Sequence, residues 1–139
     1  MCIRDSLEAM DVKLALSNIM AAETRLLLLA NQIPAALDRI AASKIYIEDT
    51  GERYYESEIL RLEGDALKAS KQPGLAEKAY RCALDTAESQ QARWWQLRAL
   101  TSLTAHCTDD SSLKKELRKL VSDFEHLDLV AVKQAILLC

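Results

Sequence analysis

The sequence predicts an all-α protein made of helical hairpins that stack as repeats. The 139 residues include only 3 glycines, 2 prolines and 5% aromatic residues, and they show no strand-like alternation of β-branched and polar residues. Apolar residues instead recur at helical spacing. A shift of about 40 residues also places Arg53-Tyr54-Tyr55 on Arg93-Trp94-Trp95. A repeat of roughly 20–50 residues is typical of stacked helix pairs.

The first predicted pair covers residues 10–49, with helices over 10–30 and 34–49. Pro34 suits a first helical turn, where its missing N–H has no helical partner. Gly51 ends the pair, because glycine readily adopts the left-handed conformation that follows a helix. The inward positions are Val12, Leu16, Ile19, Met20, Leu26 and Leu27 in the first helix and Ala36, Leu37, Ile40 and Ile47 in the second.

The second predicted pair covers residues 53–88, with helices over 53–69 and 75–88. The loop between them contains Pro73-Gly74, the strongest turn signal in the chain. Small residues dominate the second helix of this pair, so a neighbouring helix can approach it closely. These residues are Ala76, Ala79, Ala83 and Ala87.

The third predicted pair covers residues 92–124, with helices over 92–107 and 111–124. Asp110 is well placed to accept hydrogen bonds from the free N–H groups at the start of the second helix. A closing helix is expected over 128–138. All connections are short, which favours antiparallel neighbours.

Six residues of the middle pair fall at the spacings of the tetratricopeptide signature, namely Leu60, Gly64, Leu67, Ala76, Tyr80 and Ala83. Gly64 and Ala76 are expected to let the two helices come close, while Tyr80 packs into the next unit and Ala83 leaves it room. The period is longer than the usual tetratricopeptide unit of roughly 34 residues. The resemblance implies a right-handed α-α superhelix of about three antiparallel pairs with a C-terminal capping helix.

Longer stretches resemble the C-terminal helical repeats of large bacterial signalling ATPases, including those fused to adenylate/guanylate cyclase domains and related transcriptional regulators. The likeness lies in residues 50–58, 61–65, 76–84 and 97–103, and in Asp128-Leu129 followed by Ala131 and Lys133. In that family the nucleotide chemistry lies upstream of the repeats, and this chain has no GxxxxGK[ST] phosphate loop. The resemblance implies a regulatory module in the cytoplasm.

The first six residues, Met1-Cys2-Ile3-Arg4-Asp5-Ser6, resemble translated library-adapter sequence and lack an apolar signal core. We therefore interpret residues 1–6 as a non-native leader. Residues 7–139 are then expected to form a single repeat domain, a fragment of a larger protein.

Composition argues against several classes of function. The net charge of −3 provides no basic patch for nucleic acid, and no apolar run is long enough for a membrane span. The cysteines, Cys2, Cys82, Cys107 and Cys139, form no CxxC pair. We interpret them as reduced, apolar core residues of a cytosolic protein.

The best candidate surface is the groove that the first helix of each pair lines in tetratricopeptide arrays. Carried over to this chain, its residues would hold a peptide, a protein or the upstream domains of the same parent chain through charge-assisted hydrogen bonds. The alternative is an ordinary solvated helical face. The predicted groove residues are Asn18, Arg25, Glu58, Arg61, Asp65, Lys68, Arg98 and Thr101.

The two aromatic pairs are a second candidate. Neighbours on a helix lie about 100° apart, so both members of a pair cannot face the core fully. Tyr55 and Trp95 continue the apolar stripes, which leaves Tyr54 and Trp94 nearer the rim as candidate anchors for a partner. The alternative is packing between pairs at the turns.

We predict no catalytic residue, metal ligand or cofactor. His106 and Cys107 are adjacent and therefore point to different faces of a helix. The leading hypothesis is a non-enzymatic interaction and regulatory module of a bacterial signalling protein. A self-assembling homo-oligomer, driven by an exposed Leu26–Leu29 face, is the alternative, and a small helical enzyme that uses Cys107 or a carboxylate is the weakest reading.

Overall fold

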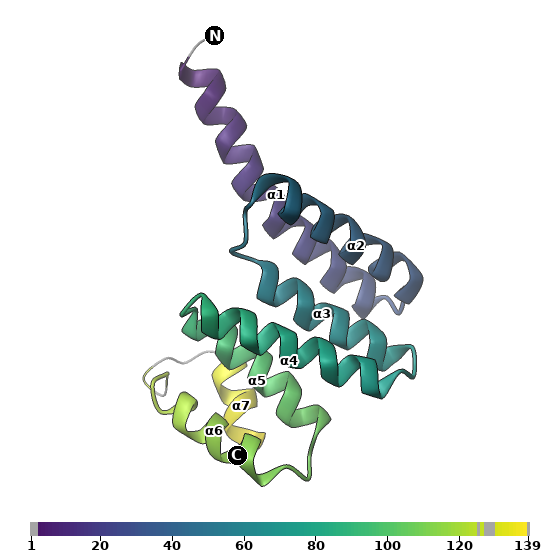
Figure 1. The fold of residues 1–139 in the computed structure, drawn as a ribbon, viewed down its shortest axis with the longest axis vertical. Helices are drawn as coiled ribbons and strands as arrows, with labels where there is room; N and C mark the ends of the chain where they lie inside the picture. The colour runs from purple at the N-terminus through teal and green to yellow at the C-terminus, as the bar shows by residue number, and fades with distance from the viewer. Residues whose placement is uncertain (1–2, 125, 127–129, 139) are drawn as a thin grey trace.

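The computed structural model describes residues 3–124, 126 and 130–138, and the side chains from residue 16 onward except that of residue 131. Helices account for the regular structure of this part of the chain and no strand occurs in it, which confirms the all-α prediction. The helices are α1 (Ile3–Leu29), α2 (Ile33–Thr50), α3 (Glu56–Ala69), α4 (Pro73–Ser89), α5 (Arg93–His106), α6 (Ser111–Val121) and α7 (Val130–Leu138) (Figure 1).

Three helix ends differ from the predicted ones by three residues or more. α1 begins at Ile3, upstream of residue 10. α3 begins at Glu56, three residues later than expected, because the Arg53 carbonyl closes a turn with the Glu56 N–H at 3.1 Å. α6 ends at Val121 because the chain tightens there, with the Phe124 N–H donating to the Val121 carbonyl at 2.8 Å. Residues 128 and 129 of the predicted closing helix lie outside the described residues.

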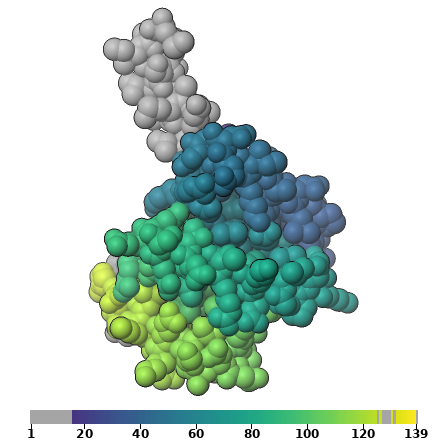
Figure 2. Space-filling view, viewed as in Figure 1, coloured from purple at the N-terminus to yellow at the C-terminus, as the bar shows by residue number. Residues whose placement is uncertain are grey.

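Successive helices pack against one another, and the first helices of the pairs form a continuous row. α1 contacts α3, α3 contacts α5, and α5 contacts α7. Among the described residues, the backbones of α2 and α4 do not come close to each other, and neither do those of α4 and α6, which pack through side chains such as Tyr80 and Leu113. The stack is therefore tighter on the side of the odd-numbered helices. In the space-filling view, the blue, teal and green parts of the chain follow one another along the molecule, and the yellow C-terminal part lies beside the green one (Figure 2).

The 40-residue repeat is visible in the backbone of two turns. Asn31 and Lys71 both adopt the left-handed conformation, with φ of 57° and 59°. The N–H groups of Gln32 and Gln72 then donate to the carbonyls five residues earlier, each at 2.9 Å. The turns after α1 and α3 thus have the same geometry, which the turn after α4 shares at Gln91. The 40-residue match of the sequence then indicates that residues 40 apart occupy equivalent places in the first two pairs.

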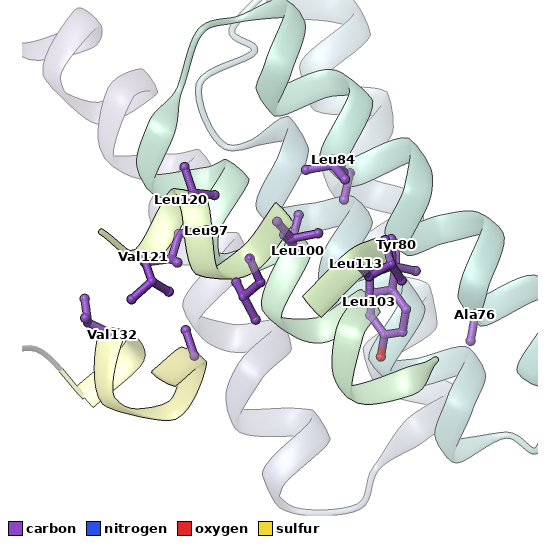
Figure 3. Close-up of a cluster of buried hydrophobic side chains, with 14 residues drawn as sticks. Ala76, Tyr80, Leu84, Leu97, Leu100, Leu103, Leu113, Leu120, Val121 and Val132 are labelled. Atoms are coloured by element: carbon purple, nitrogen blue, oxygen red, sulfur yellow. The ribbon is translucent and has the colours of Figure 1, made fainter. Parts of the chain in front are cut away.

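Gly64 allows α3 and α4 to approach, as the sequence predicted, and the group that fills the space is Tyr80. A Cβ atom at Gly64 would lie 2.4 Å from the Tyr80 ring. Tyr80 also belongs to a C-terminal core cluster, where it lies beside Leu103 and Leu113 (Figure 3). The buried members of this cluster are Ala76, Tyr80, Ala83, Leu84, Leu97, Ala99, Leu100, Leu103, Leu113, Leu117, Leu120, Val121, Val132 and Ala135. One side chain therefore closes the middle pair and contacts the following helices.

A second, N-terminal core cluster joins the first two pairs. Its buried members are Ala21, Ile40, Ile47, Ile59, Leu62 and Ala66.

Within the described residues, no helix has the length and apolar character needed to cross a membrane. The prediction that the cysteines are core residues is wrong for Cys82, which is exposed on α4, while Cys2 and Cys139 lie outside the described residues.

Candidate functional site

The centre of the predicted groove is a buried carboxylate surrounded by three arginines. Glu58 lies on α3 and its side chain is only 1% exposed. Its Oε1 atom accepts hydrogen bonds from Arg61 at 2.8 Å, from Arg98 at 2.9 Å and from Arg25 at 3.3 Å. Its Oε2 atom accepts from the Nε atoms of Arg61 and Arg98, at 2.9 and 3.2 Å. Glu58 therefore links α1, α3 and α5, the first helices of three successive pairs.

The arginines determine the charge state of Glu58. Burial alone would raise the pKa of this carboxyl, but hydrogen bonds and attraction from Arg61, and then from Arg98, outweigh burial and lower the pKa to about 2. Burial would lower the pKa of Arg61, yet its bonds to Glu58 raise it. Glu58 is thus an anion held by cations at neutral pH.

Asp65 and Tyr80 extend this network along α3. Asp65 accepts from Arg61 Nη1 at 3.0 Å and from the Tyr80 hydroxyl at 2.6 Å. Burial, and then the bond to Asp65, raises the pKa of Tyr80 above its ordinary value, so the hydroxyl remains a donor. Arg61 also reaches the Ser102 hydroxyl on α5 at 3.3 Å. The guanidinium of Arg61 is therefore fixed on both sides.

The structure brings together five of the eight predicted groove residues: Arg25, Glu58, Arg61, Asp65 and Arg98. The other three predicted groove residues form no hydrogen bond with this network, although Thr101 lines a small pocket together with Arg61 and Arg98. Asn18 and Lys68 are exposed, and the Thr101 hydroxyl donates to the Leu97 carbonyl of its own helix at 2.6 Å. Whether these residues bind a partner stays a prediction.

An open groove of about 350 Å³ lies beside the network, between α3 and the end of α1. Its walls include the apolar side chains of Leu28, Leu29 and Leu62, with Arg25 and Asp65 at its polar side. Arg25 and Arg98 remain 37% and 25% exposed. Each guanidinium carries five N–H groups and gives only part of them to Glu58. Donors are therefore available to a ligand on this face.

The two predicted rim anchors occupy different environments. Tyr54 is 64% exposed and lies in the turn before α3, where its ring meets those of Tyr55 and Trp95 edge-on at 5.0 and 5.9 Å. Trp94 is partly buried, packs on the C-terminal core cluster and meets Phe124 at 6.2 Å. Tyr54 is thus the member of the pair whose ring is open to solvent.

Cys107 and His106, the two side chains considered for catalysis, make contacts that are typical of structural residues. Burial, and then the charge of Glu77, raises the pKa of the Cys107 thiol, which disfavours the nucleophilic thiolate at neutral pH. His106 places its Nε2 atom 3.0 Å from the Pro73 carbonyl and its ring against Tyr80. No cluster of three or more metal-binding side chains occurs in the described part of the chain.

The burial of Glu58 was missed by sequence reasoning, which placed this residue in an open groove or, as the alternative, on a solvated helical face. A signal was present, because Glu58 and Arg98 are 40 residues apart and thus occupy equivalent places in successive units. Equivalent residues of stacked repeats lie side by side. Opposite charges at such a pair of positions predict an ion pair between units.

The pKa of Glu58 predicts how stability depends on pH. The folded-state pKa of Glu58 lies below the ordinary carboxyl value of 4.5. The stabilisation that the Glu58 carboxylate gives to the folded state is therefore complete above pH 4.5 and is lost as the pH falls toward about 2. The loss should reach about 3 kcal/mol across that window. Urea unfolding at several pH values, compared with Glu58→Gln, measures it. An equal pH slope in both proteins would contradict the assignment.

Comparisons with known proteins give no relative for this chain: no family model, no curated protein and no solved structure matches it.

Proposed function

We propose that the protein is a non-catalytic interaction module that binds a peptide or protein segment along the face formed by α1, α3 and α5. The observation that carries the proposal is the row of guanidinium groups fixed by Glu58 beside the open groove. Fixed donors reduce the ordering cost of binding. An apolar groove with a few polar groups at its side is the usual form of a ligand site.

The charge of this face indicates the chemistry of the partner. The network contains three arginines, Arg25, Arg61 and Arg98, and two carboxylates, Glu58 and Asp65. It therefore carries one excess positive charge. Lys68 adds a further cation on the same helix. We infer a segment that offers carboxylate or carbonyl oxygens to Arg25 and Arg98, and apolar side chains to the groove.

The arrangement of the helices supports a tetratricopeptide-like superhelix with this face on its concave side. The backbones of the odd-numbered helices lie close together in a row and those of the even-numbered helices lie further apart, which is the packing expected of a curved stack. We propose, with the sequence resemblance, that the module serves the regulatory part of a cytoplasmic bacterial signalling ATPase or cyclase-type protein.

Selection from a peptide-phage library against the full chain tests the binding function. We expect enriched peptides to carry acidic residues and to bind more weakly as salt increases. Arg25→Gln should weaken a selected peptide at least ten-fold, because Arg25 is the most exposed of the three arginines. The measurement is isothermal calorimetry on variants checked for folding by thermal unfolding.

The matched control is Arg81→Gln. Arg81 forms an ion pair with Glu77 on α4, away from the groove, at 2.8 Å. Its removal should leave the affinity unchanged. Peptides that bind the Arg25 and Arg81 variants equally well would place the binding site elsewhere, and a library without any enrichment would contradict the function itself.

Self-assembly is a second candidate, and one observation favours it. Large apolar side chains are exposed at both ends of the stack, with Leu26 and Leu29 at one end and Val130 and Leu137 at the other. The oligomeric state across a concentration series tests this candidate.

A further inference from the structure

We propose that a small pocket between α3, α5 and α7 binds a phosphoryl group. It is lined by Arg61 of α3, by Arg98, Thr101 and Ser102 of α5, and by Gln134 of α7. The pocket shares Arg61 with the apolar groove beside α1. It therefore adds a second subsite to the arginine face, and it rests on the proposed function only for the source of its ligand.

The pocket is positively charged. Two arginines line it, and no carboxylate is among the described residues of its walls. Glu58, which both arginines contact, is only 1% exposed and is also paired with Arg25. The apolar groove, by contrast, has Asp65 in its wall. An anion in the pocket therefore meets two guanidinium groups without facing an exposed acid.

Hydrogen-bond donors remain for a ligand in this pocket. Arg98 gives its Nε atom and an Nη2 N–H to Glu58, at 3.2 and 2.9 Å, and its Nη1 atom has no partner within the described residues. Ser102 accepts from Arg61 at 3.3 Å, so its own hydrogen is still to be donated. The Gln134 side chain has no hydrogen bond in the described part of the chain. Thr101 is not a donor here, because its hydrogen goes to the Leu97 carbonyl at 2.6 Å.

The size of the pocket and the spread of its donors favour a phosphoryl group. A pocket for a whole small ligand typically has roughly 300–1,000 Å³, whereas this one has about 70 Å³ and suits a single group. A carboxylate is planar and is bound most simply by two parallel N–H groups of one guanidinium. A phosphoryl group has three acceptor oxygens, which match the Arg98 guanidinium, the Ser102 hydroxyl and the Gln134 amide.

A phosphoryl group can reach the pocket from two sources. One is a phosphorylated side chain of a segment that lies in the apolar groove, because Arg61 lines both sites. The other is free inorganic phosphate. The pocket takes the same oxygens in both cases, and the sources differ in whether the groove contributes to affinity.

Titration of inorganic phosphate into the isotope-labelled full chain, at constant ionic strength, tests the pocket by NMR. We expect saturable shifts of the backbone N–H signals of Thr101, Ser102 and Gln134 at millimolar phosphate. Gln134→Glu should weaken binding about ten-fold or more, because it places a like charge beside the anion. Gln134→Lys should strengthen binding for the opposite reason.

The matched control is Gln72→Glu. Gln72 is an exposed glutamine before α4 whose side chain forms no capping hydrogen bond. The variant adds the same charge outside the pocket, so phosphate affinity should not change. Equal phosphate affinity of the Gln134→Glu and Gln72→Glu proteins would place the ion elsewhere on the surface and overturn the proposal.

A leucine–phosphoserine–leucine peptide with blocked ends separates the two sources. If the peptide binds more tightly than phosphate and Leu29→Asp removes only this gain, the pocket takes a phosphorylated segment, because Leu29 is an exposed residue of the groove. If both probes bind equally, the pocket takes free phosphate. Absence of saturation by both probes would overturn the proposal, as would acetate that binds as tightly as phosphate, since the pocket would then be a carboxylate subsite.

Failure of the pocket and failure of the proposed function give different results. The phage library presents no phosphorylated residue, so enriched peptides without phosphate binding would remove the phosphoryl subsite alone. Saturable phosphate binding without any enriched peptide would keep the pocket and remove the peptide-binding function.

Discussion

Glu58→Gln is expected to destabilise the protein by about 3 kcal/mol at neutral pH. The substitution keeps the shape of the side chain and removes the anion that holds three guanidinium groups, one of which, Arg61, is only 11% exposed. Removing one partner of a buried ion pair typically costs about 3–5 kcal/mol, because the remaining charge stays buried without compensation. Urea unfolding followed by circular dichroism measures the change.

Glu77→Gln is the matched control for this prediction. Glu77 and Arg81 form an ion pair along one helix at 2.8 Å, but both side chains are well exposed. Exposed pairs of this kind contribute about 0.3–0.5 kcal/mol. If Glu58→Gln lowered the free energy of unfolding no more than Glu77→Gln does, the Glu58 carboxylate would not hold the three helices together. The difference between Glu58→Gln and the parent should also vanish near pH 2, where the parent carboxyl becomes protonated.

Gly64→Val should destabilise the protein by about 3 kcal/mol, at the upper end of the range for overpacked cores. Even a Cβ atom at this position would lie between 2.4 and 2.9 Å from three atoms of the Tyr80 ring. The ring is 2% exposed and its hydroxyl is bound to Asp65, so it has little room to turn aside. α3 and α4 must then separate. Thermal and urea unfolding would measure the loss.

Gly74→Ala controls for the general effect of replacing a helical glycine. Gly74 lies in the first turn of α4, and a Cβ atom there has no neighbour within 4 Å. This variant should be neutral or slightly more stable, by less than about 1 kcal/mol. The combination of Gly64→Val with Tyr80→Leu should cost less than the sum of the single changes, by about 1 kcal/mol or more. Strict additivity would show that the contact with Tyr80 is not the cause.

Local patterns predicted most of the fold because its elements are set by residues close in sequence. Gly51, Pro73 and Asp110 mark helix ends in the structure, and Asp110 accepts hydrogen bonds from the Ser112 and Leu113 N–H groups at 2.9 and 3.2 Å. The start of α3 was misplaced because Tyr54 and Tyr55 continue an apolar pattern into the turn. What holds that turn is remote, since the Gln90 side chain donates to the Arg53 carbonyl at 2.9 Å.

The candidate site was less predictable, because its chemistry depends on burial that arises only when three helices meet. Arg25, Glu58 and Arg98 are separated by 33 and 40 residues, and each alone looks like a solvated surface residue. Their placement on one face followed from the repeat. To predict that these side chains pair with one another, the distance between the stacked helices must be known, and a single sequence does not supply that distance.

The position of Glu58 has a consequence for how the protein unfolds. Stacked repeats usually behave as a chain of units in which each is stabilised by its immediate neighbours, so end units fray first. Here one carboxylate is shared by Arg25 of the first pair and Arg98 of the third, two units apart. Loss of either end hairpin removes a counter-charge from the centre of the stack. We therefore expect the three pairs to unfold as a single cooperative unit, in which fraying of one end hairpin destabilises the other.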